Sequence, residues 1–194
     1  MRIFEKPGAD NTEEALTAAV RAAAERKMDI VVATGTGQTA GRLAEVAKAQ
    51  GFSGHNVAVS CVYGMHEKGK NELSDRMRKE LEGRQVRVVT AAHALSGAER
   101  GISKVFRGVY PAEIVSAAMR MLGQGVKVCV EIALMALDSG NIPYGEPVVC
   151  VAGSGGGADT VCIITPDYTA DLLQTRIHEI LCKPGLYTSC NLDK

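Results

Sequence analysis

The first ninety residues alternate between short apolar runs and longer segments in which apolar side chains recur at helical spacing. Three apolar runs have the length and composition of buried strands: 29–34, 56–61 and 85–90. Segments with helical spacing precede or separate them: 15–27, 39–50 and 71–82. Asn11 and Glu14 have the spacing of a capping box before the first of these helices. This alternation predicts right-handed crossovers and a parallel sheet.

The pattern changes after residue 90. Residues 91–108 are polar and glycine-rich, and no element is assigned to them. Pro111 suits the first turn of a helix that ends at Gly123. Residues 126–138 are apolar nearly all round, which predicts a helix in the centre of the domain.

The only charges on that central helix are Lys127, Glu131 and Asp138, which fall on one narrow stripe. A stripe of charges on a helix usually faces water, and this is the first interpretation. The alternative is that Glu131 reaches into a cleft.

The last third of the chain predicts two further strands at 147–152 and 159–164, and then a helix over 168–182. The loop between these strands is too short for a helical crossover, so the second must run antiparallel to the first. The long connection before residue 147 lets the fourth strand cross back beside the first. We therefore expect one domain over residues 1–194, with a mixed five-stranded sheet of order 3-2-1-4-5 and strand 5 antiparallel.

Composition narrows the classes of partner. Lys and Arg together number 22, as do Asp and Glu, so the chain lacks the positive charge that nucleic acid or an anionic membrane requires. No apolar run is long enough for a membrane span, and the first residues lack the apolar core of a signal peptide, so a cytoplasmic location is expected. The six cysteines form no C-x-x-C pair, which favours buried, reduced thiols.

A glycine-rich loop follows the first predicted strand. It consists of Thr34, Gly35, Thr36, Gly37, Gln38 and Thr39. Its backbone N–H groups, its hydroxyls and the positive end of the next helix suit it to hold a phosphate. The alternative is a tight strand-to-helix turn capped by Thr36 or Thr39.

A second glycine-rich loop follows the fourth predicted strand. It consists of Gly153, Ser154, Gly155, Gly156 and Gly157. One interpretation is a flexible hairpin connection. The other is the wall of a ligand site, because ordering so many glycines is entropically unfavourable. Strands one and four flank the point where the chain direction reverses, which is where α/β sheets bind ligands. The two loops should therefore face each other across a ligand.

More specific motifs fit poorly. Gly35, Gly37 and Ala40 satisfy a dinucleotide fingerprint, but the next strand does not end in the acid that binds a ribose. Ser154 lies in an approximate nucleophile elbow, but a strand-like segment follows it where a helix is required. The histidines lack ligand spacing, so no metal site is expected.

Several segments resemble the C-terminal domain of pyruvate kinase. ATGTGQTAGRLAE at 33–45 is similar to its phosphate-holding loop and helix, and residues 125–164 are similar to its last helix, strand, loop and closing strand. FEKPGADNTEE at 4–14 and HALSGAERG at 93–101 resemble stand-alone archaeal and bacterial members of this family. The resemblance implies a three-layer α/β/α sandwich and a phosphate held by the loop from Thr34 to Thr39. It implies no pyruvate kinase activity, because the catalytic barrel is absent.

The resemblance also implies a ligand, since the stand-alone proteins are associated with flavin mononucleotide (FMN). We expect FMN or another phosphorylated small molecule between the two loops. Residues after the second strand are expected to line the rest of the pocket: Tyr63, Gly64 and Met65, with His66. Plain packing of Tyr63 and Met65 is the alternative.

An enzyme acting in the same cleft is the alternative function. Its candidate catalytic residues are His93, Arg100 and Glu131, although the first two are as well explained by ordering the segment 91–108. Self-association into a homo-oligomer is the remaining expectation about partners.

Overall fold

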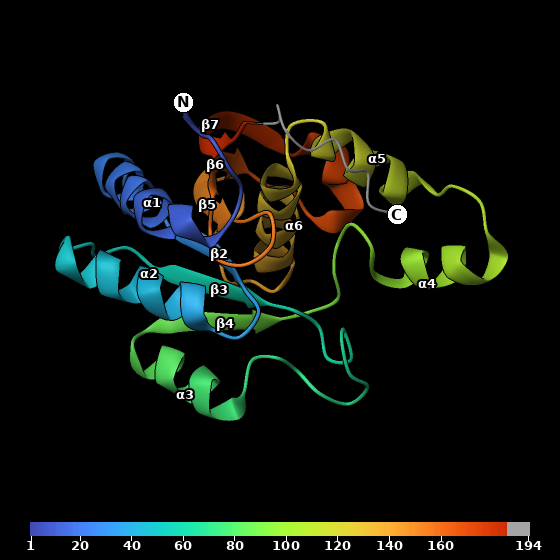
Figure 1. Cartoon of the computed structure of the whole chain (residues 1–194), viewed down its shortest axis with the longest axis horizontal. Helices are drawn as coiled ribbons and strands as arrows, with labels where there is room; N and C mark the ends of the chain where they lie inside the picture. The colour runs from blue at the N-terminus through green and yellow to red at the C-terminus, as the bar shows by residue number, and fades with distance from the viewer. Residues whose placement is uncertain (186–194) are drawn as a thin grey trace.

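The protein is an α/β structure in which helices cover both faces of one sheet (Figure 1). The computed structural model describes residues 1–185. Along the chain its elements are β1 (Arg2–Phe4), η1 (Ala9–Asn11), α1 (Thr12–Arg26), β2 (Ile30–Thr34), α2 (Gln38–Ala49), β3 (Asn56–Ser60), α3 (Asp75–Gly83), β4 (Val86–Thr90), α4 (Gly97–Phe106), α5 (Pro111–Arg120), α6 (Gln124–Asp138), β5 (Val148–Ala152), β6 (Thr160–Thr165), η2 (Thr169–Gln174) and β7 (Arg176–Pro184).

The sheet has seven strands in the order β1-β7-β6-β5-β2-β3-β4, so the prediction of a five-stranded sheet of order 3-2-1-4-5 is wrong. The strands foreseen from the sequence are β2 to β6, and they occupy one continuous part of the sheet. β2 pairs in parallel with β3 and β5, β3 pairs in parallel with β4, and β6 pairs antiparallel with β5. The two additional strands, β7 and β1, extend the sheet beyond β6.

The predicted helix over 168–182 is also wrong. A short 3₁₀ helix, η2, turns the chain back, and β7 then pairs antiparallel with β6 along the side of β6 that faces away from β5. Pairing with this otherwise open strand edge prevails over the helical spacing of the leucines and isoleucines, as tertiary context often does over local preference.

Each face of the sheet has its own apolar core. On one face, Ile30 and Val32 of β2 pack with α1, α2 and α3. On the other, Val31 of the same strand packs against α6, which is buried over most of its length. A Cβ on Gly125 would stand 2.0 Å from the Thr160 hydroxyl oxygen, so this glycine lets α6 approach β6 closely. The alternation along β2 thus fixes which helices lie in which layer.

Two local predictions are corrected by the side chains. Asn11 precedes α1, but its amide donates to the carbonyls of Lys6 and Gly8, so no capping box forms. The unassigned segment 91–108 contains α4, which has no buried residue and projects from the body as an arm (Figure 1). Within residues 1–185, no helix has the length and apolar character needed to cross a membrane.

Candidate functional site

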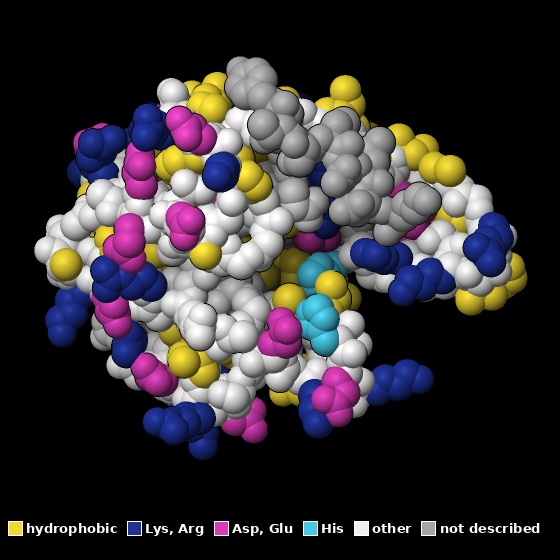
Figure 2. Space-filling view, viewed as in Figure 1, with side chains coloured by type: hydrophobic (Ala, Val, Ile, Leu, Met, Phe, Trp, Pro, Cys, Tyr) yellow, Lys and Arg dark blue, Asp and Glu magenta, His cyan; other side chains and the backbone are white. Residues whose placement is uncertain are grey.

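A cleft of about 350 Å³ lies where β2, β3 and β5 end, and α6 forms its opposite wall. It is the site that the order of the strands predicts, because the carboxyl ends of β2 and β5 meet there. Figure 2 shows a hollow between the body and the arm that carries α4, with histidine side chains at its rim. The predicted site residues that line the cleft are Thr34, Met65, His93, Arg100, Glu131, Gly153, Ser154, Gly155 and Gly157.

The other predicted ligand-binding residues do not line the cleft: Gly35, Thr36, Gly37, Gln38, Thr39, Tyr63, Gly64 and Gly156. Thus both glycine-rich loops border one cavity, but the first contributes only its first residue. Tyr63 is exposed, with 54% of its surface accessible.

The first loop is a strand-to-helix turn held by Thr34. The Gly37 N–H donates to the Thr34 hydroxyl at 3.1 Å, and Gly37, at φ 97°, is the residue before α2, so neither Thr36 nor Thr39 caps this helix. A Cβ on Gly37 would stand 2.3 Å from Met77 and 2.8 Å from Leu73. Packing against the residues at the start of α3 therefore accounts for this glycine without a ligand.

An acidic side chain lies beside the same loop. A Cβ on Gly35 would stand 2.9 Å from Oε2 of Glu72, and the other carboxylate oxygen of Glu72 lies 3.5 Å from His66 Nε2. A bound anion at the start of α2 would meet this negative charge.

The second loop is braced by a buried aspartate that sequence reasoning missed. Oδ2 of Asp159 accepts from the Ser154 N–H at 3.1 Å and from the Gly8 N–H at 3.0 Å. Gly157 packs so closely on Ala9 and Thr12 that a Cβ there would overlap both. Within the described residues, Cβ atoms on Gly155 and Gly156 would meet nothing within 4 Å. One end of the loop is therefore fixed, and its middle is open.

A buried ionic cluster forms the α6 side of the cleft. Lys127 Nζ lies 2.5 Å from Oε2 of Glu131, and His93 Nδ1 lies 3.4 Å from the same oxygen. The other carboxylate oxygen accepts from the Leu95 N–H at 3.1 Å. Lys127 and Glu131 are only 5% and 3% exposed. The interpretation that the stripe faces water is wrong for both, while Asp138 at the end of α6 is exposed.

The two charges on α6 perturb each other. Burial by itself raises the pKa of Glu131, but the hydrogen bond from His93 and the charge of Lys127 outweigh it and hold that pKa at about 2. Burial lowers the pKa of Lys127, and the attraction of Glu131 opposes that change. Glu131 is therefore an anion at neutral pH.

His93 lies between this carboxylate and a thiol. Contact with the Cys61 side chain, followed by the hydrogen bond to Glu131, raises the pKa of His93 to about 9. His93 Nε2 is buried and has no hydrogen-bond partner among the described residues. His93 is thus a cation at neutral pH with one ring nitrogen available.

Residues 13–164 match the family described as pyruvate kinase, alpha/beta domain. The chain belongs to this family. The match begins in α1 and reaches β6, so it contains the five foreseen strands except for the last residue of β6. β1 and β7, which widen the sheet, lie outside the part that matches the pyruvate kinase alpha/beta domain.

In this pyruvate kinase alpha/beta domain, the cleft lining includes three ionisable side chains that the sequence did not single out as binding residues: Cys61, Arg120 and Lys127. A signal existed for Lys127, because it stands four residues before Glu131 on an otherwise apolar helix. Arg120 ends α5 and reaches the cleft only through the packing of α5 on α6. No local pattern reveals such a contact.

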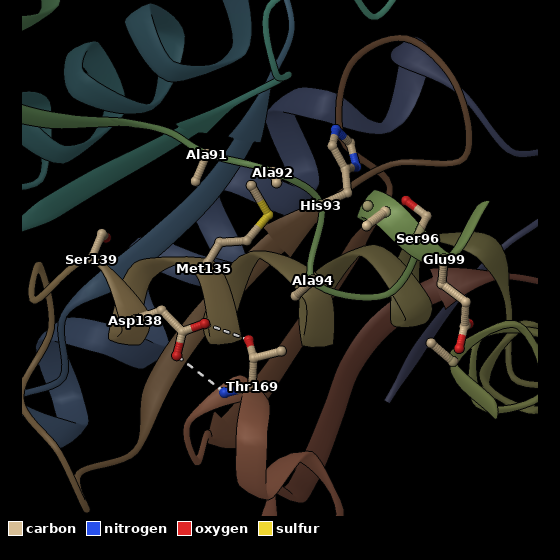
Figure 3. A pocket seen from close by; sticks show the side chains of 13 residues that line it. Ala91, Ala92, His93, Ala94, Ser96, Glu99, Met135, Asp138, Ser139 and Thr169 are labelled. Carbon is tan, nitrogen blue, oxygen red and sulfur yellow. Dashed lines mark hydrogen bonds between the residues drawn. The ribbon is translucent and has the colours of Figure 1, made fainter. Parts of the chain in front are cut away.

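A second cavity of about 420 Å³, the alanine pocket, lies on the other side of His93 and Met135 (Figure 3). It is named for Ala91, Ala92, Ala94, Ala98 and Ala112, which line it. Asp138 accepts from the N–H and the hydroxyl of Thr169, and Glu99 accepts from the Glu113 N–H at 3.0 Å. The acids of the alanine pocket are thus already bound to other parts of the chain.

Proposed function

We propose that the cleft binds a small molecule that carries a phosphate, with FMN as the ligand that the family resemblance suggests. The observation that supports the anion best is the charge of the lining. Lys127, Arg100 and Arg120 line the cleft together with the cationic His93, and Glu131 is the only carboxylate among the lining residues. Its volume lies within the range of roughly 300–1,000 Å³ that is usual for small-molecule sites.

The position of the phosphate follows from the same charges. The start of α2 offers backbone dipoles, but the carboxylate of Glu72 lies beside it. The arginines offer bidentate donors on the opposite wall, and Arg120 is bonded only to Gln124 and Ser116 within the described residues. We therefore place the phosphate toward Arg100 and Arg120, and the remainder of the ligand toward Thr34 and the open middle of the second loop.

The part of the ligand beyond the phosphate rests on the resemblance. Met65 is the lining residue best suited to contact a flavin ring, and the lining side chains include no phenylalanine, tyrosine or tryptophan. Comparing FMN with riboflavin, which lacks the phosphate, therefore separates the two halves of the proposal.

The test is a titration of the full chain with FMN and with riboflavin, followed by flavin fluorescence. We expect FMN to bind at least tenfold more tightly than riboflavin, and Arg120→Gln to remove about tenfold of FMN affinity, as the loss of one charge-assisted hydrogen bond predicts. Lys104→Gln is the matched control, because Lys104 is an exposed cation on α4 outside the cleft lining. Equal affinities for FMN and riboflavin would refute the phosphate site.

Catalysis in the same cleft is the second candidate, and one observation favours it. His93, Arg100 and Glu131, the three residues proposed from the sequence as catalytic, all line the cleft. A flavin-dependent oxidoreductase would oxidise reduced nicotinamide when loaded with FMN. Binding of FMN without turnover of any electron donor would leave binding as the function. A cytoplasmic location and self-association into a homo-oligomer stay predictions.

A further inference from the structure

The cleft contains a thiol that differs from the other cysteines of the described residues. Cys61 follows β3 directly, lines the cleft and is partly exposed. Cys129, Cys150, Cys162 and Cys182 are buried in the apolar cores. Burial raises the pKa of the Cys129 and Cys150 thiols well above the usual value, and that of Cys182 to about 12. A reagent that enters the cleft therefore reaches only Cys61 among them.

His93 stands beside this thiol in the arrangement that an activated nucleophile requires. Both side chains line the cleft, beyond the paired ends of β3 and β4, and His93 Nδ1 lies 3.4 Å from the Glu131 carboxylate. The carboxylate is fixed in turn by Lys127 and by the Leu95 N–H. A thiol beside a histidine cation that a third group holds in place is an arrangement that activates a cysteine nucleophile. His93 Nε2 is buried without a hydrogen-bond partner among the described residues, so its N–H is free to donate to a thiolate.

We propose that Cys61 is a nucleophile that attacks an electrophilic carbon of a small anionic compound bound in the cleft. The proposal rests on the anion site of the proposed function, because Lys127, Arg100 and Arg120 would hold the negative group of that compound. The charged side chains that line the cleft with the thiol are these three cations, His93 and Glu131.

The step balances in atoms and electrons. The thiol proton leaves to water, and the thiolate sulfur, which faces the His93 imidazolium, forms a bond to the electrophilic carbon. The bond from that carbon to its leaving group breaks, and the leaving group departs with the electron pair. Glu131 stabilises the His93 imidazolium, which in turn stabilises the thiolate. Iodoacetate is a suitable probe, because it joins a carboxylate to a carbon from which iodide leaves, and iodoacetamide is its neutral counterpart.

The test treats the full chain with either reagent at pH 7 and maps modified cysteines by peptide mass spectrometry. Cys190 lies outside the described residues, so the measurement uses a Cys190→Ser background. We expect Cys61 to react first. The ratio of the iodoacetate rate to the iodoacetamide rate should be at least about tenfold higher in the folded protein than in the urea-unfolded protein, as charge steering predicts.

Two further measurements distinguish an activated Cys61 thiol from one that is merely accessible to the reagent. The rate ratio should fall as pH rises through about 9, because His93 then loses its positive charge. Arg120→Gln should lower the ratio several-fold, and Lys104→Gln should leave it unchanged. The proposal is overturned if the folded and unfolded proteins have the same ratio of iodoacetate rate to iodoacetamide rate, or if Cys61 reacts no faster than Cys182. Neither result depends on the Arg120 or Lys104 variants.

Protection by FMN distinguishes this proposal from the proposed function. If Cys61 shows the expected selectivity and FMN gives no protection, FMN is refuted as the ligand and the nucleophile is supported. If FMN binds and the selectivity is absent, the nucleophile is refuted and the ligand site is supported.

Discussion

The cleft and the alanine pocket share a wall, formed by His93, Ser96 and Met135, yet they have opposite electrostatic character. The cleft gathers cations around one buried carboxylate. The alanine pocket contains the carboxylates of Glu99 and Asp138 and no lysine or arginine among its lining residues.

The difference extends to hydrogen bonding. In the alanine pocket, both acids bind backbone N–H groups and so hold η2 and α5 in place. In the cleft, one nitrogen of His93 has no partner among the described residues, and the arginines lie on the wall of the cavity. The alanine pocket is therefore a gap between elements that brace each other, and the cleft has free donors of the kind that a ligand needs.

The largest effect is expected when the ionic cluster of the cleft is broken. Glu131→Leu leaves the Lys127 ammonium and the Leu95 N–H buried without an acceptor, so we expect it to lower the free energy of unfolding by about 3–5 kcal/mol. Urea unfolding measures this loss. The control is the double variant Lys127→Met with Glu131→Leu, which removes both charges and should recover most of the stability. A single variant as stable as the wild type would show that the cluster is not buried.

A smaller effect is expected from pH, through the same cluster. Since the folded pKa of His93 is about 9 and its ordinary value is 6.5, the stability that His93 contributes is complete below pH 6.5 and is lost between 6.5 and 9. The folded pKa of Glu131 is about 2 and its ordinary value is 4.5, so Glu131 contributes stability above pH 4.5 that is lost as pH falls toward 2. The expected loss on the alkaline side is on the order of 2 kcal/mol. Chemical unfolding across pH 5–9 measures it, and His93→Gln should flatten that limb. An unchanged alkaline limb in His93→Gln would contradict the assignment.

The smallest effect is expected in the alanine pocket. Asp138→Asn keeps an oxygen for the Thr169 N–H but weakens the bond from the Thr169 hydroxyl, so we expect a loss of about 0.5–1 kcal/mol in the free energy of unfolding. FMN affinity should not change. If Asp138→Asn reduced FMN affinity as much as Arg120→Gln, the roles assigned to the two cavities would be reversed.

The strands that the sequence predicts are those with strong local signals. β2 to β6 are continuous apolar runs that end at glycine, proline or polar residues, so their existence and neighbours follow from pattern and connection length. β1 is only three residues long, which is too short for an alternation of apolar and polar residues to be recognised. The segment that forms β7 is predicted as a helix because its isoleucines and leucines recur at helical spacing. It is a strand because it pairs with the open edge of β6.

The site shows the same division between local and tertiary information. His93, Arg100 and Glu131 could be nominated because two follow a strand end and one interrupts an apolar helix. Cys61 looked like any cysteine beside an apolar run, since its neighbour His93 lies 32 positions away in the sequence. The first glycine loop shows the opposite case, and its binding of a phosphate stays a prediction. Gly37 fits an anion cradle locally, while the contact with Met77 that also requires a glycine is tertiary.

The far edge of the sheet has a consequence for solubility. β1 pairs with β7 only from Cys182 to Pro184, so within the described residues the stretch Arg176–Leu181 presents a strand edge with no neighbour on that side. Such an edge is a template on which another chain can add a strand. Ionisable side chains lie along this edge, at Arg176, His178 and Glu179. Arg26 of α1 donates two hydrogen bonds to the Glu179 carboxylate. Substituting valine for these three residues would let the edge pair with strands of other chains. The protein would then be expected to form fibrous aggregates before it unfolds.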